Sequence, residues 1–331
     1  MEDNDMEMKA FADKVRNALK KELSEGTEVR ISKVRKNNGI ELHGVSVFRP
    51  GENVTPTVYL EDYLVRYRGG EPFAEILREL KAVLDSNRLN HTFSVEAFAR
   101  WEQAKERIVY KLINANKNSR LLEEVPHVLY LDLAVVFYYL LSGDNYGNAS
   151  ILINHKHREQ WDVSEEELYA VAKANTRKLM PQKLQDMEAL LREIILQDVE
   201  RRKAERPLGE DSDKMAEEML HAAMADKDVP LMYVLTNRQK YFGAACMLYT
   251  GLLKEIAGQL GHNLFILPSS VHELILLPDK GMDTPERLCD MVREVNETQV
   301  SAEEVLSDNV YYYNSEEDRV CVVRQMAEAQ R

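Results

Sequence analysis

The sequence predicts an α+β protein, in which an N-terminal helix–β-meander–helix unit precedes a larger mixed α/β body with short antiparallel hairpins. Three observations predict this class. Apolar residues recur at helical spacing between residues 8 and 23, and an Asn-Gly pair at 38–39 separates two strand-like runs. Two apolar runs, at 264–267 and 274–277, are too short for helices, and each is followed by proline.

In the N-terminal unit, apolar periodicity and turn signals place each element. The expected elements are, in order, a helix at 6–23, strands at 29–36, 40–48 and 55–60, and a helix at 73–84. The first two strands flank Asn38 and Gly39, which form a hairpin signal because both residues tolerate positive φ. The apolar phase changes at His43 and Gly44, which predicts a β-bulge. Pro56 confines the third strand to a sheet edge or a strand start.

The first half of the body is expected to combine helices with one hairpin. Its expected elements are a long helix from 94 to 113, a hairpin of runs at 129–141 and 149–154, a capped helix ending at 175, and helices at 187–199 and 215–223. Ser164 and Glu167 have the spacing of a capping box, and Asn175 is a residue type that often ends helices. The polar segment 206–213 predicts an exposed loop.

The last third is expected to place a helix before a central hairpin. The pattern predicts, in order, a strand at 230–236, a turn at 237–241, a helix at 243–260, strands at 264–267 and 274–277, a helix from 285, and strands at 309–313 and 319–323. Gly261 is expected just past a helix end, and Thr284 with Pro285 caps and starts the next helix. The central hairpin should be deeply buried at Leu264, Ile266, Ile275 and Leu277.

Length and composition restrict the class of protein. At 331 residues the chain is long enough for two domains, and the polar segment 87–93, interpreted as a linker, separates a unit at 1–90 from a body at 94–331. No apolar run reaches the roughly 20 residues of a membrane span. The acidic N-terminus lacks the pattern of a secretory signal. The cytoplasm is therefore the expected location, and no membrane partner is expected.

Charge and ligand spacing argue against several classes of partner. The net charge of −13 disfavours nucleic acid, and the two basic runs at 33–36 and 201–206 are short and lack interleaved aromatic residues. The three cysteines show neither zinc nor disulfide spacing. His155 and His157 would lie on one side if their segment were extended, but no third ligand can be named, so solvated histidines are favoured. No metal or cofactor is expected.

The densest cluster of reactive side chains lies in the loop between the two central strands. This loop and the turn before it hold the candidate binding residues Ser269, Ser270, His272, Glu273, Asn237 and Arg238. One interpretation is a serine nucleophile with a histidine base. Against it, Ser270 and His272 share a face only in an extended loop, and no nucleophile-elbow motif exposes a hydroxyl. The favoured interpretation is a structural turn, and contact with a ligand or partner is the next.

Several segments of the chain resemble one known family. They are Lys-Asn-Asn-Gly at 36–39, Asn-Val-Thr-Pro-Thr-Val-Tyr-Leu at 53–60, Trp-Asp-Val-Ser-Glu-Glu-Glu-Leu at 161–168, Val-Leu-Thr-Asn at 234–237, Leu-Pro-Ser-Ser-Val-His-Glu at 267–273 and Leu-Ser-Asp-Asn-Val-Tyr at 306–311. Nearly the full chain thus resembles an uncharacterised Firmicutes family, the domain-of-unknown-function family fifty-six eighty-eight. The resemblance implies a bacterial cytoplasmic protein and brings no activity, cofactor or catalytic residue.

The predicted function is a protein-interaction or regulatory module without a cofactor. It follows from the lack of a phosphate loop, a metal-ligand set, a nucleophile elbow and a dense basic face in the sequence. The expected partner is a protein. The alternative is a hydrolase-like enzyme with a pocket at the loop from Pro268 to Glu273. A deep pocket lined by these side chains favours the enzyme, whereas a flat loop bonded to backbone favours the module.

Overall fold

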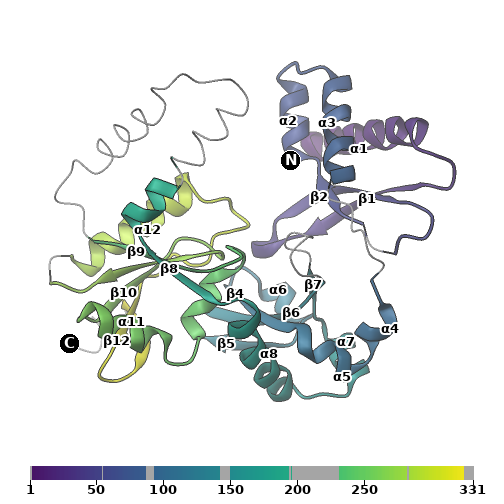
Figure 1. Ribbon diagram of the computed structural model, residues 1–331. Coiled ribbons are helices and arrows are strands. Elements are labelled where there is room, and N and C mark those ends of the chain that lie inside the picture. The colour runs from purple at the N-terminus through teal and green to yellow at the C-terminus, as the bar shows by residue number, and fades with distance from the viewer. Residues whose placement is uncertain are drawn as a thin grey trace, which may run out of the picture.

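The structure is a computed structural model of the chain. It describes residues 2–53, 55–86, 93–141, 150–193, 195, 231–281 and 283–323. The predicted exposed loop at 206–213, the predicted helix at 215–223 and all of the predicted linker except Phe93 lie outside these residues. The described residues form an α+β fold with three antiparallel sheets (Figure 1). None of the described helices is long and apolar enough to cross a membrane.

The N-terminal unit has the predicted helix–meander–helix order with one additional helix. Its elements are α1 (Glu2–Glu22), β1 (Glu28–Arg35), β2 (Glu41–Phe48), β3 (Thr57–Tyr59), α2 (Glu61–Arg68) and α3 (Phe73–Ser86). The hairpin predicted at Asn38 and Gly39 is confirmed, and β3 lies at the sheet edge, as Pro56 indicates. The helix α2 was not predicted from the sequence. Apolar side chains of both helix and sheet form a core cluster within residues 8–84.

The predicted β-bulge at His43 and Gly44 is wrong. Both residues pair one to one with β1, and the register continues without an extra residue. Val45 and Val47 face the core, whereas Leu42 is half-buried on the opposite face. The change of apolar phase therefore reflects a change of environment along the strand and requires no insertion.

The middle of the chain forms a second sheet with helices around it. Its elements are α4 (Val95–Ala99), α5 (Trp101–Ala104), β4 (Ile108–Asn114), α6 (Ser119–Leu122), β5 (His127–Tyr130), β6 (Leu133–Leu140), β7 (Ser150–Leu152), α7 (His155–Trp161) and α8 (Glu165–Leu179). The strand β6 pairs with β4 on one side and with β5 and β7 on the other. The predicted hairpin is confirmed as β6 and β7, although a turn at Leu131 (φ 57°) divides its first run.

Two helix predictions in this region are wrong, one in the type of element and one in the position where the helix ends. The long helix predicted from residue 94 gives way to short helices and to β4, because residues 108–114 are covered on both faces and such a strand needs no apolar–polar alternation. The helix α8 passes Asn175 and ends at Leu179. The Asn175 amide instead donates to the carbonyls of Lys105 and Ile108, at 2.7 and 3.0 Å. The predicted Ser164 cap is confirmed, since its hydroxyl accepts the Glu167 N–H.

The C-terminal part forms a six-stranded sheet with the order β13-β12-β10-β11-β9-β8. Its elements are β8 (Gln182–Asp186), β9 (Tyr233–Asn237), the short 3-10 helix η3 (Gly243–Leu248), α11 (Leu252–Leu260), β10 (Leu264–Pro268), β11 (Leu274–Pro278), α12 (Pro285–Thr298), β12 (Tyr311–Asn314) and β13 (Arg319–Val322). The strand β8 was not predicted. Residues 187–193 are helical, and most of the rest of the helix predicted at 187–199 lies outside the described residues.

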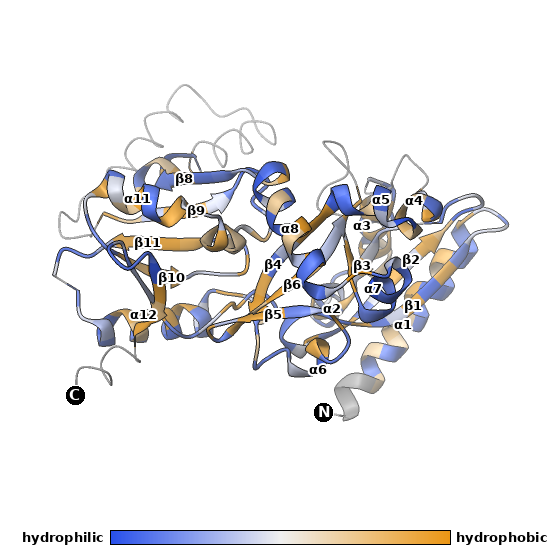
Figure 2. Cartoon of the chain, turned by 90° about the horizontal axis from the view of Figure 1, so that it is seen from below, coloured by the Kyte–Doolittle hydropathy of each residue, from blue (hydrophilic) through white to orange (hydrophobic). Residues whose placement is uncertain are grey.

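The predicted central hairpin is confirmed as β10 and β11, which lie in the middle of this sheet and are strongly apolar (Figure 2). Leu264, Ile266 and Leu277 are buried, but Ile275 is only half-buried, which corrects its expected deep burial. The helix predicted at 243–260 is interrupted, because Gly251 (φ 74°) separates η3 from α11. These two helices pack on one face of the sheet and α12 packs on the other.

Candidate functional site

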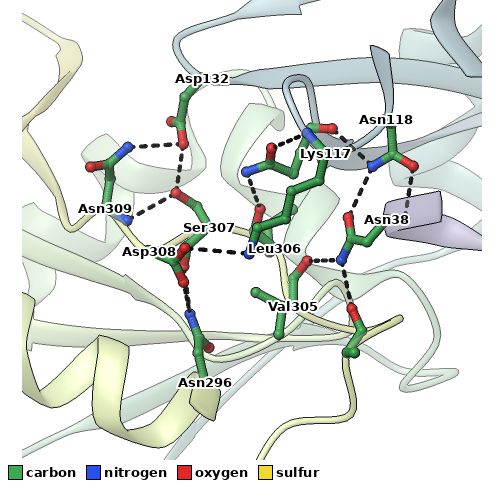
Figure 3. A network of polar contacts seen from close by, with 12 residues as sticks. Asn38, Lys117, Asn118, Asp132, Asn296, Val305, Leu306, Ser307, Asp308 and Asn309 are labelled. Atoms are coloured by element: carbon green, nitrogen blue, oxygen red, sulfur yellow. Dashed lines mark hydrogen bonds and ion pairs between the residues drawn. The ribbon is translucent and has the colours of Figure 1, made fainter. Parts of the chain in front are cut away.

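The tip of the N-terminal hairpin docks onto a segment of the C-terminal part (Figure 3). The Asn38 amide donates to the carbonyls of Ala302 and Val305, at 2.8 and 2.7 Å. Its backbone N–H donates to Asn118 Oδ1 at 2.8 Å. Asn38 has φ of 59°, a conformation that asparagine tolerates better than most residues. The residue that predicts the hairpin therefore also joins the N-terminal unit to the other two parts.

The same segment, residues 302–309, is also bound to the middle sheet through Asp132 (Figure 3). We call it the docking segment. One carboxylate oxygen accepts from Ser307 Oγ at 2.6 Å and from Asn309 Nδ2 at 3.0 Å. The other accepts the Tyr311 hydroxyl at 2.8 Å. Nearby, Lys117 Nζ lies 3.3 Å from an oxygen of Asp308. The segment is thus held in place on both sides, by the hairpin tip and by the second sheet.

A cavity of about 250 Å³ lies at this junction, and we call it the junction pocket. Its polar lining comes from three parts of the chain. The N-terminal hairpin contributes Asn37, β4 contributes Lys111, and the C-terminal part contributes His272, Glu303 and Glu304. These residues are far apart in the sequence, so the pocket exists only when all three parts are assembled.

His272 is the one sequence-predicted candidate that lines the junction pocket. Its Nδ1 accepts the backbone N–H of Phe242 at 3.1 Å, so the ring proton of the neutral imidazole is on Nε2. That nitrogen lies 3.4 Å from Glu304 Oε1. Burial lowers the pKa of His272. The imidazole is therefore a neutral hydrogen-bond donor at neutral pH, with its acceptor nitrogen already occupied.

The other predicted candidates hold the loop and the turn. Ser270 Oγ accepts the backbone N–H of His272 at 3.0 Å, and Ser269 Oγ lies 3.5 Å from a Glu273 carboxylate oxygen. The buried Asn237 side chain bonds the backbone of Tyr241 with both its amide nitrogen and its oxygen. Arg238 is exposed and its backbone N–H donates to the Pro181 carbonyl. Their part in ligand or partner binding stays a prediction.

The turn before the pocket carries an unfavourable backbone conformation. Lys240 and Phe242 have φ of 52° and 54°, and the left-handed region is costly for a bulky side chain. Two hydrogen bonds hold this conformation: the Tyr241 N–H donates to Asn237 Oδ1, and the Phe242 N–H donates to His272 Nδ1. As a result, the Phe242 ring stacks on the His272 ring, with centroids 5.5 Å apart and planes 8° apart.

Lys111 is the pocket residue that sequence reasoning missed. Its Nζ lies 4.3 Å from the centroid of the Phe242 ring, and no carboxylate oxygen of the described residues lies within 4.0 Å of it. Burial, together with the charge of Lys36, lowers the pKa of Lys111 from 10.5 to about 8. The available signal was a lone lysine inside the apolar run at 108–113, which marks a buried charge once the run is assigned as a strand.

Other features of the described residues offer less chemistry. An open groove of about 940 Å³ follows the edge strand β5, beside Leu129, whose side chain is 64% exposed. His157 completes a capping box with Asn154, so it has a structural role at the start of α7. In the described part of the chain, no three His, Cys, Asp or Glu side chains form a group that could hold a metal ion.

Comparison with known proteins supplies the family. The comparisons with curated proteins and with solved structures find no match. One family does match, and the match covers residues 8–315, so it includes the hairpin tip, Lys111, His272 and the docking segment. The chain belongs to this family, which is described as a family of unknown function (DUF5688).

Proposed function

We propose that this chain is a bacterial, cytoplasmic regulatory module that binds an anionic group of a ligand in the junction pocket, and that a protein partner recognises the ligand-bound form. The observation that carries the proposal is the Lys111 ammonium, which faces the pocket without a carboxylate partner among the described residues. Lys111 is half-buried, and an ammonium that is withdrawn from water without a partner costs free energy. An anionic group in the pocket removes this cost and returns the pKa of Lys111 towards its ordinary range.

The position of the pocket supports a regulatory role. A ligand there contacts Asn37 from the hairpin tip, Lys111 from β4 and His272 from the C-terminal sheet. Such a ligand binds only the assembled form. It therefore stabilises the docking of the N-terminal unit, by about 2.7 kcal/mol at a ligand concentration one hundred times Kd. The predicted domain boundary near residue 90 is part of this proposal, and the separate core cluster within residues 8–84 supports it.

Surface charge favours a protein partner over nucleic acid. In the basic run at 33–36, Lys33 and Arg35 are paired with carboxylates, and Lys36 Nζ lies 4.2 Å from the centroid of the Tyr59 ring. Lys33 Nζ lies 2.7 Å from an oxygen of Glu41, and Arg35 lies 3.9 Å from Glu41 and 3.6 Å from Glu124. Phosphate binding depends on unpaired cations in a row. The other basic run, at 201–206, lies outside the described residues.

The hydrolase-like alternative has less support. A serine nucleophile needs its hydroxyl within reach of the histidine ring. Ser270 Oγ instead accepts the backbone N–H of His272, and the two imidazole nitrogens face Phe242 and Glu304. Hydrolysis of 4-nitrophenyl acetate that disappears in Ser270→Ala would support this alternative.

Thermal melting of the full chain with small carboxylic acids tests the proposal. At least one acid should raise the melting temperature, and its uncharged amide should not. The shift should disappear in Lys111→Met and persist in Lys280→Met, which replaces an exposed lysine. Because the pKa of Lys111 is about 8, binding should weaken as the pH rises above that value. The proposal is wrong if no acid stabilises the wild type or if the shift survives in Lys111→Met.

A further inference from the structure

We propose that the junction pocket binds a small zwitterion of the α-amino acid class, with its carboxylate at Lys111 and His272 and its ammonium at Glu303 and Asn37. This inference rests on the proposed function, because it names the ligand class of the same pocket. It follows from three properties of the pocket: two acceptors without donors, two donors whose acceptors are weak or distant, and a balanced charge.

We call Asn37 and Glu303, which carry acceptors without donors, the acceptor pole, and we call Lys111 and His272 the donor pole. Within the described residues, five buried side-chain polar atoms have no hydrogen-bond partner, and two of them, Asn37 Oδ1 and Glu303 Oε2, belong to pocket-lining residues. The Asn37 amide nitrogen donates to the Glu303 carbonyl at 2.8 Å, which fixes Oδ1 as the free acceptor. A buried acceptor without a donor is costly. An ammonium group supplies three donors, and a ligand ammonium can satisfy these atoms once the Asn37 and Glu303 side chains turn towards the pocket.

The donors form the other pole. The Lys111 ammonium contacts the face of the Phe242 ring, and a ring face is a weaker acceptor than a carboxylate. The Nε2–H of His272 faces Glu304 at 3.4 Å, which is long for a charge-assisted hydrogen bond. A ligand carboxylate has two oxygens, and it can therefore accept from both groups at shorter distances.

Charge balance selects a neutral ligand. The lining includes two lysines, Lys36 and Lys111, and two glutamates, Glu303 and Glu304. Inorganic phosphate or a dicarboxylate would add a surplus of negative charge to a lining that already holds two glutamates, and a diamine would add a surplus of positive charge to a lining that holds two lysines. A zwitterion places one charge at each pole and leaves the net charge unchanged.

Size and wall chemistry restrict the ligand further. The volume of about 250 Å³ lies just below the range of about 300–1,000 Å³ that is typical of drug-sized ligands, so a smaller molecule is favoured. Ile113, Val271 and Phe242 supply apolar lining to the same pocket. The lining therefore suits an amino acid with an apolar side chain.

Isothermal titration calorimetry on the full chain tests the inference. The probes are free amino acids with apolar side chains and, for the tightest of them, the matched acid without the amine and the matched amine without the acid. For leucine these are 4-methylpentanoate and 3-methylbutylamine. At least one amino acid should bind, and both analogues should bind at least tenfold more weakly, because each loses charge-assisted hydrogen bonds at one pole.

A pair of variants separates the two poles. Glu303→Gln should weaken the amino acid at least tenfold and leave the acid analogue within threefold, whereas Glu316→Gln, at an exposed position, should change neither. An acid analogue that binds the wild type as tightly as the amino acid overturns the zwitterion and leaves the Lys111 anion site intact. If neither amino acids nor acids bind, both proposals fail. The analogue series uses the wild-type protein, so it does not depend on the folding of any variant.

Discussion

Replacing Lys111 with methionine should make the ligand-free protein more stable at neutral pH. Methionine is similar in volume and unbranched, so it can occupy the same space beside Phe242 without the charge. Burial lowers the pKa of Lys111 from 10.5 to about 8, which corresponds to about 3 kcal/mol at 1.36 kcal/mol per pKa unit. The lost contact with the Phe242 ring offsets about 1 kcal/mol. The expected gain is therefore about 2 kcal/mol.

The pH dependence of this gain follows from the sign of the shift. Below pH 8 both the folded and the unfolded chain hold the Lys111 proton, so the wild type bears the full cost of the buried charge. Between pH 8 and 10.5 the folded chain releases a proton that the unfolded chain keeps, and the stability of the wild type rises relative to the variant. The advantage of Lys111→Met should thus be largest at neutral pH and disappear towards pH 10.5.

Urea unfolding measures this difference in amino-acid-free buffer. Trp101 and Trp161, the two tryptophans of the chain, both pack in the core cluster of the body, so their fluorescence follows the part that holds Lys111. The exposed Lys280→Met serves as the control at each pH, because it removes a lysine without changing the pocket. The reasoning is refuted if Lys111→Met is less stable than the wild type at pH 7, or if the difference is the same at pH 7 and at pH 10.5.

Two further predictions concern the central hairpin and the docking of the hairpin tip. Ile266→Ala should lower the free energy of unfolding by about 2–5 kcal/mol, because Ile266 is fully buried. Ile275 is half-buried on the next strand, so Ile275→Ala should cost less than about 2 kcal/mol. Equal urea midpoints of the two variants would contradict this prediction. Asn38→Ala should loosen the docked tip and speed hydrogen exchange at the Val271 N–H, which donates to the Glu304 carbonyl within the docking segment. Asn38→Gly serves as the control, because glycine keeps the positive φ accessible but removes the amide hydrogen bonds. If Asn38→Gly exchanges at the wild-type rate, the backbone conformation and not the amide hydrogen bonds holds the tip.

Local signals predicted the elements that local chemistry decides. The Asn38 turn, the Ser164 cap and the start of α12 at Thr284 depend on residues within a few positions of each other. The strand β4 was mistaken for a helix because Ile108 and Leu112 also fit helical spacing. What makes this segment a strand is its pairing with β6, across a separation of about twenty residues or more that no short window contains.

The pocket was beyond sequence prediction for the same reason on a larger scale. His272 was named because it lies in a visibly polar loop, but its neighbours in space come from the hairpin tip, from β4 and from residues 303–304. Lys111 was overlooked because the predicted helix at 94–113 does not reveal the strand in which Lys111 lies between buried apolar neighbours. Only the assembled chain shows a lysine, a neutral histidine and two glutamates around one cavity.

Ligand binding and docking of the N-terminal unit must influence each other if the pocket is used as proposed. Asn38 holds the tip through two amide hydrogen bonds to the docking segment, each worth about 0.5–1.5 kcal/mol net. A ligand at one hundred times its Kd adds about 2.7 kcal/mol to the docked form, which is comparable to the contribution of both bonds together. By reciprocity, a partner that binds the tip in its undocked form must weaken the ligand by the same factor. The tip also bonds the Glu303 carbonyl through Asn37 and bonds Asn118 through Asn38, so ligand occupancy changes only a part of the docking free energy and shifts the arrangement of the chain by that part.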